Sequence, residues 1–184
     1  MLTGSKILEE LRNGNIGITP FDIKNLNPNS YNVTLSNKLK VYKNPDFLYV
    51  DRENPTEDII IPEEGLLLKP GVLYIGATKE IISSNEYISA IDGRSSIGRL
   101  GINIHATAGF GDVGFSGTYT LEIFVVQPVL IKPNILIGQV SFTKPTGDID
   151  FLYKGRYNNQ VDPTASRLHM TEEQLDKEYH YKSN

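Results

Sequence analysis

The chain has 184 residues and a formal net charge of −4 at pH 7. This length is most simply one domain with room for a substantial core, and the acidic balance argues against a nucleic-acid binder, whose surface is usually basic. The absence of cysteine excludes disulfides, thiol chemistry and the zinc-dependent nucleoside deaminases, whose metal needs a P-C-x-x-C pair.

Targeting and membrane segments are not expected. Residues 1–14 combine lysine, arginine and glutamate without the apolar run of a signal peptide. The most apolar stretch, 121–142, is interrupted by two prolines and by charged and amide side chains, which leaves it too broken to span a membrane. We therefore expect a cytoplasmic protein that does not contact membranes.

In chain order, the apolar pattern predicts one short helix followed by many strands. Residues Ser5–Arg12 place Ile7, Leu8 and Leu11 on one side of a helix that Gly14 ends. Strand-like runs follow at 31–35, 38–42, 58–62, 65–69, 71–77, 87–91, 118–126 and 135–142. Many short strands in succession predict an all-β sandwich or barrel.

The tail of the chain has a different character. Residues 145–167 mix proline and glycine with tyrosine, lysine and arginine, and they show little apolar periodicity. We interpret this segment as a mobile lid within a single domain that spans residues 1–184. Residues 171–180 open with Thr-Glu-Glu-Gln, which is typical of a capped polar helix.

A glycine-rich run with dense polar residues indicates the functional site. Residues 92–101 read D-G-R-S-S-I-G-R-L-G, residues 107–112 read T-A-G-F-G-D, and Leu121-Glu122 follow. Arginines and hydroxyls beside backbone N–H groups suit a polyanion such as a triphosphate. Carboxylates next to them suit the activation of a water molecule.

The order of these blocks resembles the dCTP deaminase branch of the dUTPase superfamily. The segment Asn27–Leu35 is similar to the family's N-P-x-S-Y-D-x-x-L, with Asn32 where aspartate is usual, and residues 137–139 resemble its fourth block. Tyr157-x-x-Gln160 with P-T-x-S-R at 163–167 resembles its C-terminal lid. The resemblance covers roughly residues 1–168. It implies a distorted β-barrel of the dUTPase-like (β-clip) type, assembled as a homotrimer with sites between subunits and with C-terminal arms that close over the ligand.

The resemblance also implies catalytic roles. Glu122 would be the base that takes a proton from water, although strand alternation alone places it on a solvated face. Asp112 would contact the sugar 3′-hydroxyl and activate water, although aspartate is also a common turn former. Ser95 and the backbone of Ala108 would hold the water, and Arg99 would stabilise the ionised glutamate.

Further residues would bind the substrate. The ring of Phe115 would exclude a ribose 2′-hydroxyl, although it is equally an ordinary core aromatic. The polar side chains assigned to substrate binding, mostly through the phosphates, are Arg94, Ser96, Thr107, Gln139, Tyr153, Arg156 and Gln160. By pattern alone, several of these are surface or loop residues.

The expected reaction is a zinc-independent hydrolysis of dCTP, with Mg²⁺ carried by the triphosphate and no metal held by the protein. Gly109-Phe110 resembles the bifunctional enzymes that continue to pyrophosphate and dUMP, and dUMP is a precursor of dTTP. Gly111 departs from the family, which usually has an aliphatic residue before this aspartate. The alternatives are a deaminase that stops at dUTP, a plain dUTPase, and a nucleotide-sensing protein without catalysis. Whether dTTP inhibits is left open.

Overall fold

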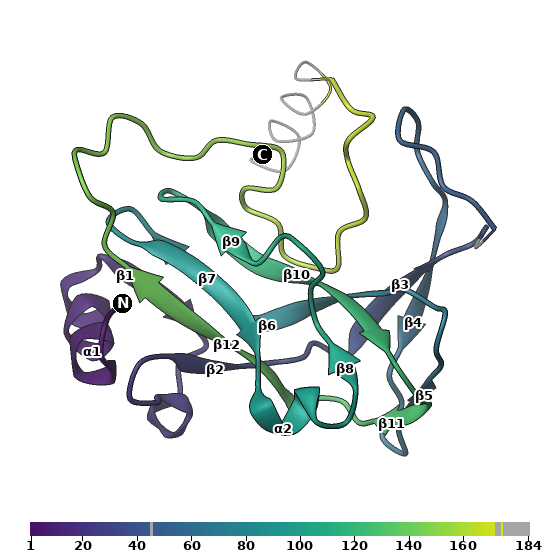
Figure 1. Cartoon of the computed structure of the whole chain (residues 1–184). Coiled ribbons are helices and arrows are strands. Elements are labelled where there is room, and N and C mark those ends of the chain that lie inside the picture. Colours follow the sequence, from purple (N-terminus) through teal and green to yellow (C-terminus); the bar gives the residue numbers. More distant parts are fainter. Residues whose placement is uncertain (45, 172–173, 175–184) are drawn as a thin grey trace.

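The computed structural model describes residues 1–44, 46–171 and 174, and strands dominate it (Figure 1). The elements are α1 (Gly4–Asn13), β1 (Ile16–Thr19), the 3-10 helix η1 (Ile23–Asn25), β2 (Tyr31–Thr34), β3 (Lys38–Tyr42), β4 (Thr56–Ile60), β5 (Leu66–Leu68), β6 (Tyr74–Ser84), β7 (Ile88–Gly93), α2 (Ser95–Gly98), β8 (Ile102–Asn103), β9 (Phe110–Gly111), β10 (Ser116–Val125), β11 (Val129–Ile131) and β12 (Leu136–Thr143). The predicted all-β barrel with an N-terminal helix and a C-terminal arm is confirmed.

Three antiparallel sheets make up the barrel. The largest has the order β4-β3-β6-β10-β8, and β1 also pairs with β6. The second has the order β2-β12-β7-β9, and β5 pairs with β11 in a short ribbon. The long strands β6 and β10 lie side by side, with Glu122 opposite Ile75. The candidate site lies against this pair of strands.

The core lies between the two larger sheets. Val33 of β2, Leu39 of β3, Leu121 and Ile123 of β10 and Phe142 of β12 are all fully buried. Burial of such a side chain contributes about 2 kcal/mol relative to exposure. Because these residues come from both sheets, the same contacts that close the barrel also hold β10 in place.

The N-terminal helix docks on the barrel and ends as predicted. Ile7 is fully buried, the Thr3 side chain accepts a hydrogen bond from the Lys6 N–H, and Gly14 ends the helix at φ 78°. That positive φ is a conformation in which glycine carries no steric cost.

Element boundaries agree best for strongly alternating segments. The strand predicted at 38–42 is β3 itself, whereas the run predicted at 71–77 begins later and continues to Ser84. The short elements β1, α2, β8, β9 and β11 were not predicted separately. The helix predicted at 171–180 lies almost wholly outside the described residues. Over the described ranges, no helix is long and apolar enough to cross a membrane.

The segment after β12 returns across the barrel. Within the described part of the chain, residues 144–171 form turns and extended loops without a strand. Figure 1 shows this segment in green and yellow, running across the top of the view above β9 and down toward β10. We call residues 145–167 the arm.

Candidate active site

A cavity of about 390 Å³ lies between β9, β10 and the arm. The predicted site residues that line it are Ala108, Asp112, Phe115, Glu122, Tyr153 and Gln160. The other lining residues are Tyr42, Leu73, Ile75, Phe110, Gly111, Tyr119, Thr120, Tyr157, Thr164, Ala165 and Ser166. As far as the chain is described, the lining contains two carboxylates and no lysine or arginine. Its chemistry therefore suits an uncharged ring and a sugar better than a triphosphate.

Glu122 lies on β10 with a half-buried side chain that faces this cavity. Its Oε2 atom accepts a hydrogen bond of 3.2 Å from the backbone N–H of Ala106. Strand alternation alone predicted a solvated carboxylate. In the structure the carboxylate is half-buried in the cavity wall and has this one backbone donor.

Asp112 and Phe115 are held by a single turn. The Phe115 N–H donates to the Asp112 carbonyl at 3.0 Å, and Gly114 within the turn has φ 95°. The Asp112 side chain is exposed at the rim of the cavity, whereas Phe115 is buried. The Phe115 ring packs against Tyr119 and Tyr153, with centroids 5.1 and 6.3 Å away. The turn thus fixes a carboxylate and an aromatic wall together.

The structure explains the unusual glycine before Asp112. A Cβ atom on Gly111 would lie 1.9 Å from the Tyr119 hydroxyl and 2.6 Å from Ser89 Oγ. These two hydroxyls hydrogen-bond to each other at 2.7 Å. Burial raises the pKa of Tyr119 to about 12, so its phenol is neutral at physiological pH. The tyrosine hydroxyl therefore occupies the space that an aliphatic side chain would fill.

Tyr119 reaches the cavity because β10 pairs irregularly. Between Thr118 and Thr120 the register with β6 shifts, and Thr78 Oγ1 accepts the hydrogen bond from the Tyr119 N–H at 2.9 Å. Simple alternation places Tyr119 and Glu122 on opposite faces, yet both line the cavity. Irregular pairing of this kind re-aims side chains and is common near functional sites.

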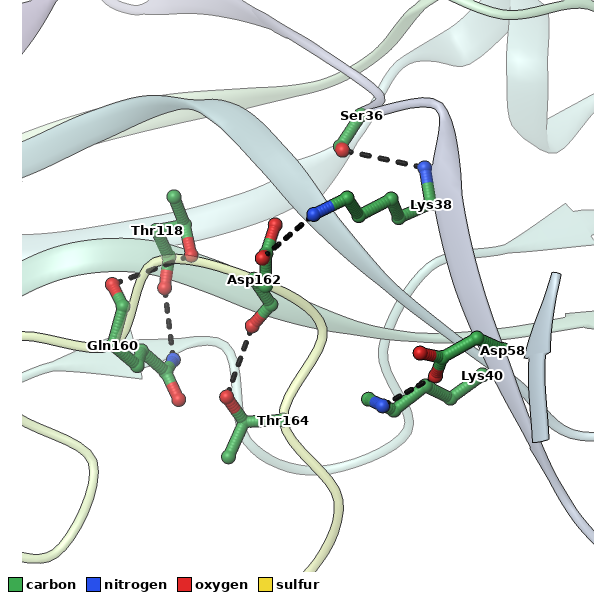
Figure 2. A network of polar contacts seen from close by, with 8 residues as sticks. All are labelled: Ser36, Lys38, Lys40, Asp58, Thr118, Gln160, Asp162 and Thr164. Carbon is green, nitrogen blue, oxygen red and sulfur yellow. Dashed lines mark hydrogen bonds and ion pairs between the residues drawn. The ribbon is translucent and has the colours of Figure 1, made fainter. Parts of the chain in front are cut away.

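The arm docks through backbone-directed hydrogen bonds. Gln160 Nε2 donates to the Thr118 carbonyl and the Thr118 N–H donates to the Gln160 carbonyl, both at 2.8 Å. The Tyr153 N–H donates to the Val113 carbonyl at 2.8 Å. An ion pair of 2.9 Å between Lys38 and Asp162 adds an exposed contact (Figure 2). These contacts close the arm over the cavity in this structure.

The Arg156 side chain hydrogen-bonds to backbone carbonyls further along the chain. Its Nη1 atom donates to the carbonyls of Arg167 at 2.8 Å and Met170 at 3.2 Å. The guanidinium does not line the cavity. In this conformation it supports the end of the arm, and the phosphate role predicted for it stays a prediction.

Other predicted residues lie away from the cavity. Arg94 is the residue before α2, Ser95 and Ser96 lie within it, and Arg99 follows it. Figure 1 shows α2 at the bottom of the view, whereas β9 and the arm lie at the top. Thr107 is exposed close to Ala108 and does not line the cavity either. One chain by itself therefore does not bring the predicted phosphate-binding arginines to the predicted base.

Gln139 of β12 also lies outside the cavity. Its side chain links β12 to the neighbouring strand β7 and to the N-terminal segment Asn27–Leu35. Its Oε1 accepts from Ser30 Oγ at 2.8 Å, and its Nε2 donates to the Gly93 carbonyl at 3.1 Å. Beside it, Asn27 and Asn32 exchange reciprocal amide hydrogen bonds of 2.9 and 3.3 Å. An aspartate at 32 would lose the second of these bonds, which accounts for the asparagine.

Two polar atoms in the cavity wall are buried without a partner among the described residues. They are Thr120 Oγ1 and Gln160 Oε1. Sequence reasoning did not single out Thr120 or Tyr119, because both sit in an ordinary alternating strand. The sequence signal that could have indicated them was their position, since Thr120 lies two residues and Tyr119 three residues before Glu122.

No cluster of metal-ligating side chains occurs in the described ranges: histidines and carboxylates do not gather there in groups of three or more.

Comparison with known proteins gives a consistent result. The dCTP deaminase-like family model matches residues 1–144. A "dCTP deaminase, dUMP-forming" from Clostridium beijerinckii is 52% identical over 159 residues, which cover 86% of this chain and 91% of that protein. A protein with the same description from Hathewaya histolytica is 48% identical, covering 91% of this chain and 96% of its own length.

A solved structure supports the fold. The crystal structure of 2′-deoxycytidine 5′-triphosphate deaminase from Agrobacterium tumefaciens superimposes with a TM-score of 0.61 at 17% identity. The match covers 78% of this chain and 47% of that chain.

Proposed function

Because the chain belongs to the dCTP deaminase-like family, we propose that it deaminates dCTP and then hydrolyses the resulting dUTP to dUMP and pyrophosphate. The observation that carries the proposal is one cavity lined by Glu122, Asp112 and Phe115, in a chain about half identical to proteins described as dUMP-forming. The dUMP formed would serve as a precursor of dTTP.

Deamination needs a base beside the pyrimidine C4 atom. Glu122 takes a proton from a water molecule, the hydroxide attacks C4, and the proton passes to N3. The proton of the new C4 hydroxyl then passes to the 4-amino group, the C4–N bond breaks, and ammonia leaves a C4 carbonyl behind. The Ala106 N–H holds the carboxylate from one side at 3.2 Å. Acid–base assistance of this kind supplies about 10²- to 10⁴-fold in rate, and positioning of the water supplies more.

The second step needs a carboxylate near the sugar and the phosphates. Asp112 stands at the rim of the cavity, where it would bind the 3′-hydroxyl and orient a water molecule toward the α-phosphorus. Phe115 beside it forms the wall against which the deoxyribose packs. A rigid buried ring leaves no room for a 2′-hydroxyl.

The cations that the phosphates require would come from a second copy of the chain. Among the described residues, the cavity lining carries no lysine or arginine, while Arg94 and Arg99 flank α2, and Ser95 and Ser96 lie within it, outside the cavity. A homotrimer whose sites lie between subunits would unite the two halves. Mg²⁺ would arrive on the triphosphate and neutralise part of its charge, because it prefers phosphate oxygens.

Product analysis tests the proposal directly. Incubation with dCTP and Mg²⁺ should release ammonia and pyrophosphate in equal amounts and leave dUMP, while CTP should react far more slowly. Accumulation of dUTP would limit the enzyme to the first step, and pyrophosphate release from dUTP alone would identify a dUTPase. Binding without any product would indicate a nucleotide sensor. A cytoplasmic location and inhibition by dTTP stay predictions.

A further inference from the structure

Thr120 carries a hydroxyl that the protein leaves unused. Its Oγ1 atom is buried in the cavity wall, and among the described residues it has no hydrogen-bond partner. A buried hydroxyl without a partner costs free energy, so most such groups in native proteins are paired. The group is therefore a candidate to pair with a molecule that enters the cavity.

Neighbouring hydroxyls on the same two strands are paired. Thr78 Oγ1 donates to the Glu80 carbonyl at 2.8 Å and accepts from the Tyr119 N–H. Thr118 Oγ1 donates to the Gln160 carbonyl at 3.4 Å. Thr120 also lines the cavity, and its hydroxyl differs from these neighbours in making none of these bonds.

A second unpaired atom borders the same cavity. Because Gln160 Nε2 donates to the Thr118 carbonyl at 2.8 Å, the orientation of this amide is fixed and its Oε1 is left without a described partner. The nearby wall is otherwise apolar and aromatic, with Ile75 and Phe115 among its members. A largely apolar pocket with a few unpaired polar atoms is typical of a site for a flat polar ring.

We propose that the Thr120 hydroxyl binds the edge of the pyrimidine base that deamination changes. The inference rests on the proposed function for the identity of the base. Thr120 lies two residues before Glu122 on β10, so the two side chains lie about 7 Å apart along one face of the strand. A base whose C4 atom is near Glu122 has its N3–C4 edge within reach of Thr120.

A hydroxyl suits both bases of a two-step reaction. Cytosine offers an acceptor at N3 and a donor at its 4-amino group, whereas uracil offers a donor at N3 and an acceptor at O4. A threonine hydroxyl can donate or accept by rotating about one bond. Thr120 therefore binds the substrate and the deaminated intermediate without any movement of the backbone.

The test uses Thr120→Val, which keeps the side-chain shape and removes the hydroxyl. We expect kcat/KM for dCTP and for dUTP each to fall about tenfold, because one hydrogen bond to the base is lost. Thr120→Ser should recover most of the loss. Thr143→Val, at the exposed end of β12, is the matched control and should behave like the wild type.

Thermal unfolding separates this role from a structural one. Without ligand, Thr120→Val should raise Tm by about 2–4 °C, because an unpaired buried hydroxyl is removed. With dUTP whose α,β-bridging oxygen is replaced by NH, the ligand-induced rise in Tm should be smaller than in the wild type. A lower Tm without ligand, or equal ligand shifts and equal kinetics in the two proteins, would overturn the inference.

The same measurements distinguish failure of the inference from failure of the proposed function. If the wild type released no ammonia from dCTP, the deaminase proposal would fail, and the ligand-induced Tm shifts alone would decide the role of Thr120. A wild type that shows no Tm shift with either dCTP or the imido analogue would contradict both.

Discussion

Glu122 joins two properties that a strand residue seldom combines, a half-buried carboxylate and a backbone N–H donor at 3.2 Å. Glu122→Gln keeps the shape of the side chain but cannot accept the proton from water. Ammonia release from dCTP should fall by about 10²-fold or more, while affinity for the nucleotide changes little. Coupled ammonia assays and calorimetric titration measure the two quantities.

The control for Glu122→Gln is Glu64→Gln, at an exposed carboxylate in the turn before β5. It should retain the wild-type rate. Residual ammonia release by Glu122→Gln within tenfold of the wild-type rate would assign the proton transfer to another group.

A substitution at Asp112 should affect the second chemical step more than the first. In Asp112→Asn, pyrophosphate release should fall much further than ammonia release, because Asp112 lies at the exposed rim of the cavity, where the sugar is proposed to bind, while Glu122 is half-buried on β10. dUTP should then accumulate, which chromatography of the products can detect. Asp148→Asn, an exposed change outside the cavity, should leave both steps intact. Equal loss of both activities would mean that Asp112 only orients the substrate.

At the scale of elements, β9 and β10 pack closely where Gly111 of β9 meets the Tyr119 hydroxyl of β10. The Tyr119 hydroxyl fills the position of a Gly111 Cβ, at 1.9 Å. Gly111→Ala should therefore destabilise the fold by about 1–3 kcal/mol through overpacking, measured by urea unfolding. Gly93→Ala is the matched control, because nothing lies within 4 Å of its Cβ position.

A double mutant tests this explanation. Tyr119→Phe removes the oxygen that a Gly111 Cβ would meet, so the double variant should be less destabilised than the sum of the two single changes. Strictly additive effects would show that the strain at Gly111 has another source.

Elements with a strong two-residue period could be predicted from the sequence, and irregular ones could not. The alternation of residues 38–42 gave the bounds of β3 correctly. The register shift between Thr118 and Thr120 depends on the Thr78 side chain of the neighbouring strand, which no local pattern reveals. The same shift brings Tyr119 into the cavity, so the site was predicted only in part.

Three residues singled out by the ordered motifs, Glu122, Asp112 and Phe115, line the same cavity. Their catalytic and binding roles stay predictions. In the proposed homotrimer, the positions of Arg94 and Ser95 relative to them would depend on how the subunits pack, which one sequence does not specify. Thr120 became visible only through its unpaired hydroxyl, a property of packing in three dimensions.

At the scale of the whole molecule, the charges are divided. The cavity of one chain presents Asp112 and Glu122, whereas Arg94 and Arg99 flank α2 outside it. Arg94 is itself anchored, since its Nη1 donates to the Leu136 carbonyl at 3.1 Å. The proposed triphosphate site would therefore combine the cavity half of one copy with the α2 half of another.

Mixing two inactive variants tests this shared site. Glu122→Gln removes the base from the cavity half, and Ser95→Ala removes a hydroxyl from the α2 half. Each variant alone should lose most deaminase activity.

After the two are unfolded together and refolded in equal amounts, about a quarter of the sites should contain both intact halves if cyclic trimers assemble at random. Deaminase activity should recover to about that fraction of the wild-type value, whereas mixing without unfolding should recover less if subunits exchange slowly. No recovery in refolded trimers would place both residues in the same chain's site, and the separation of α2 from the cavity would then have to close by a movement within one subunit.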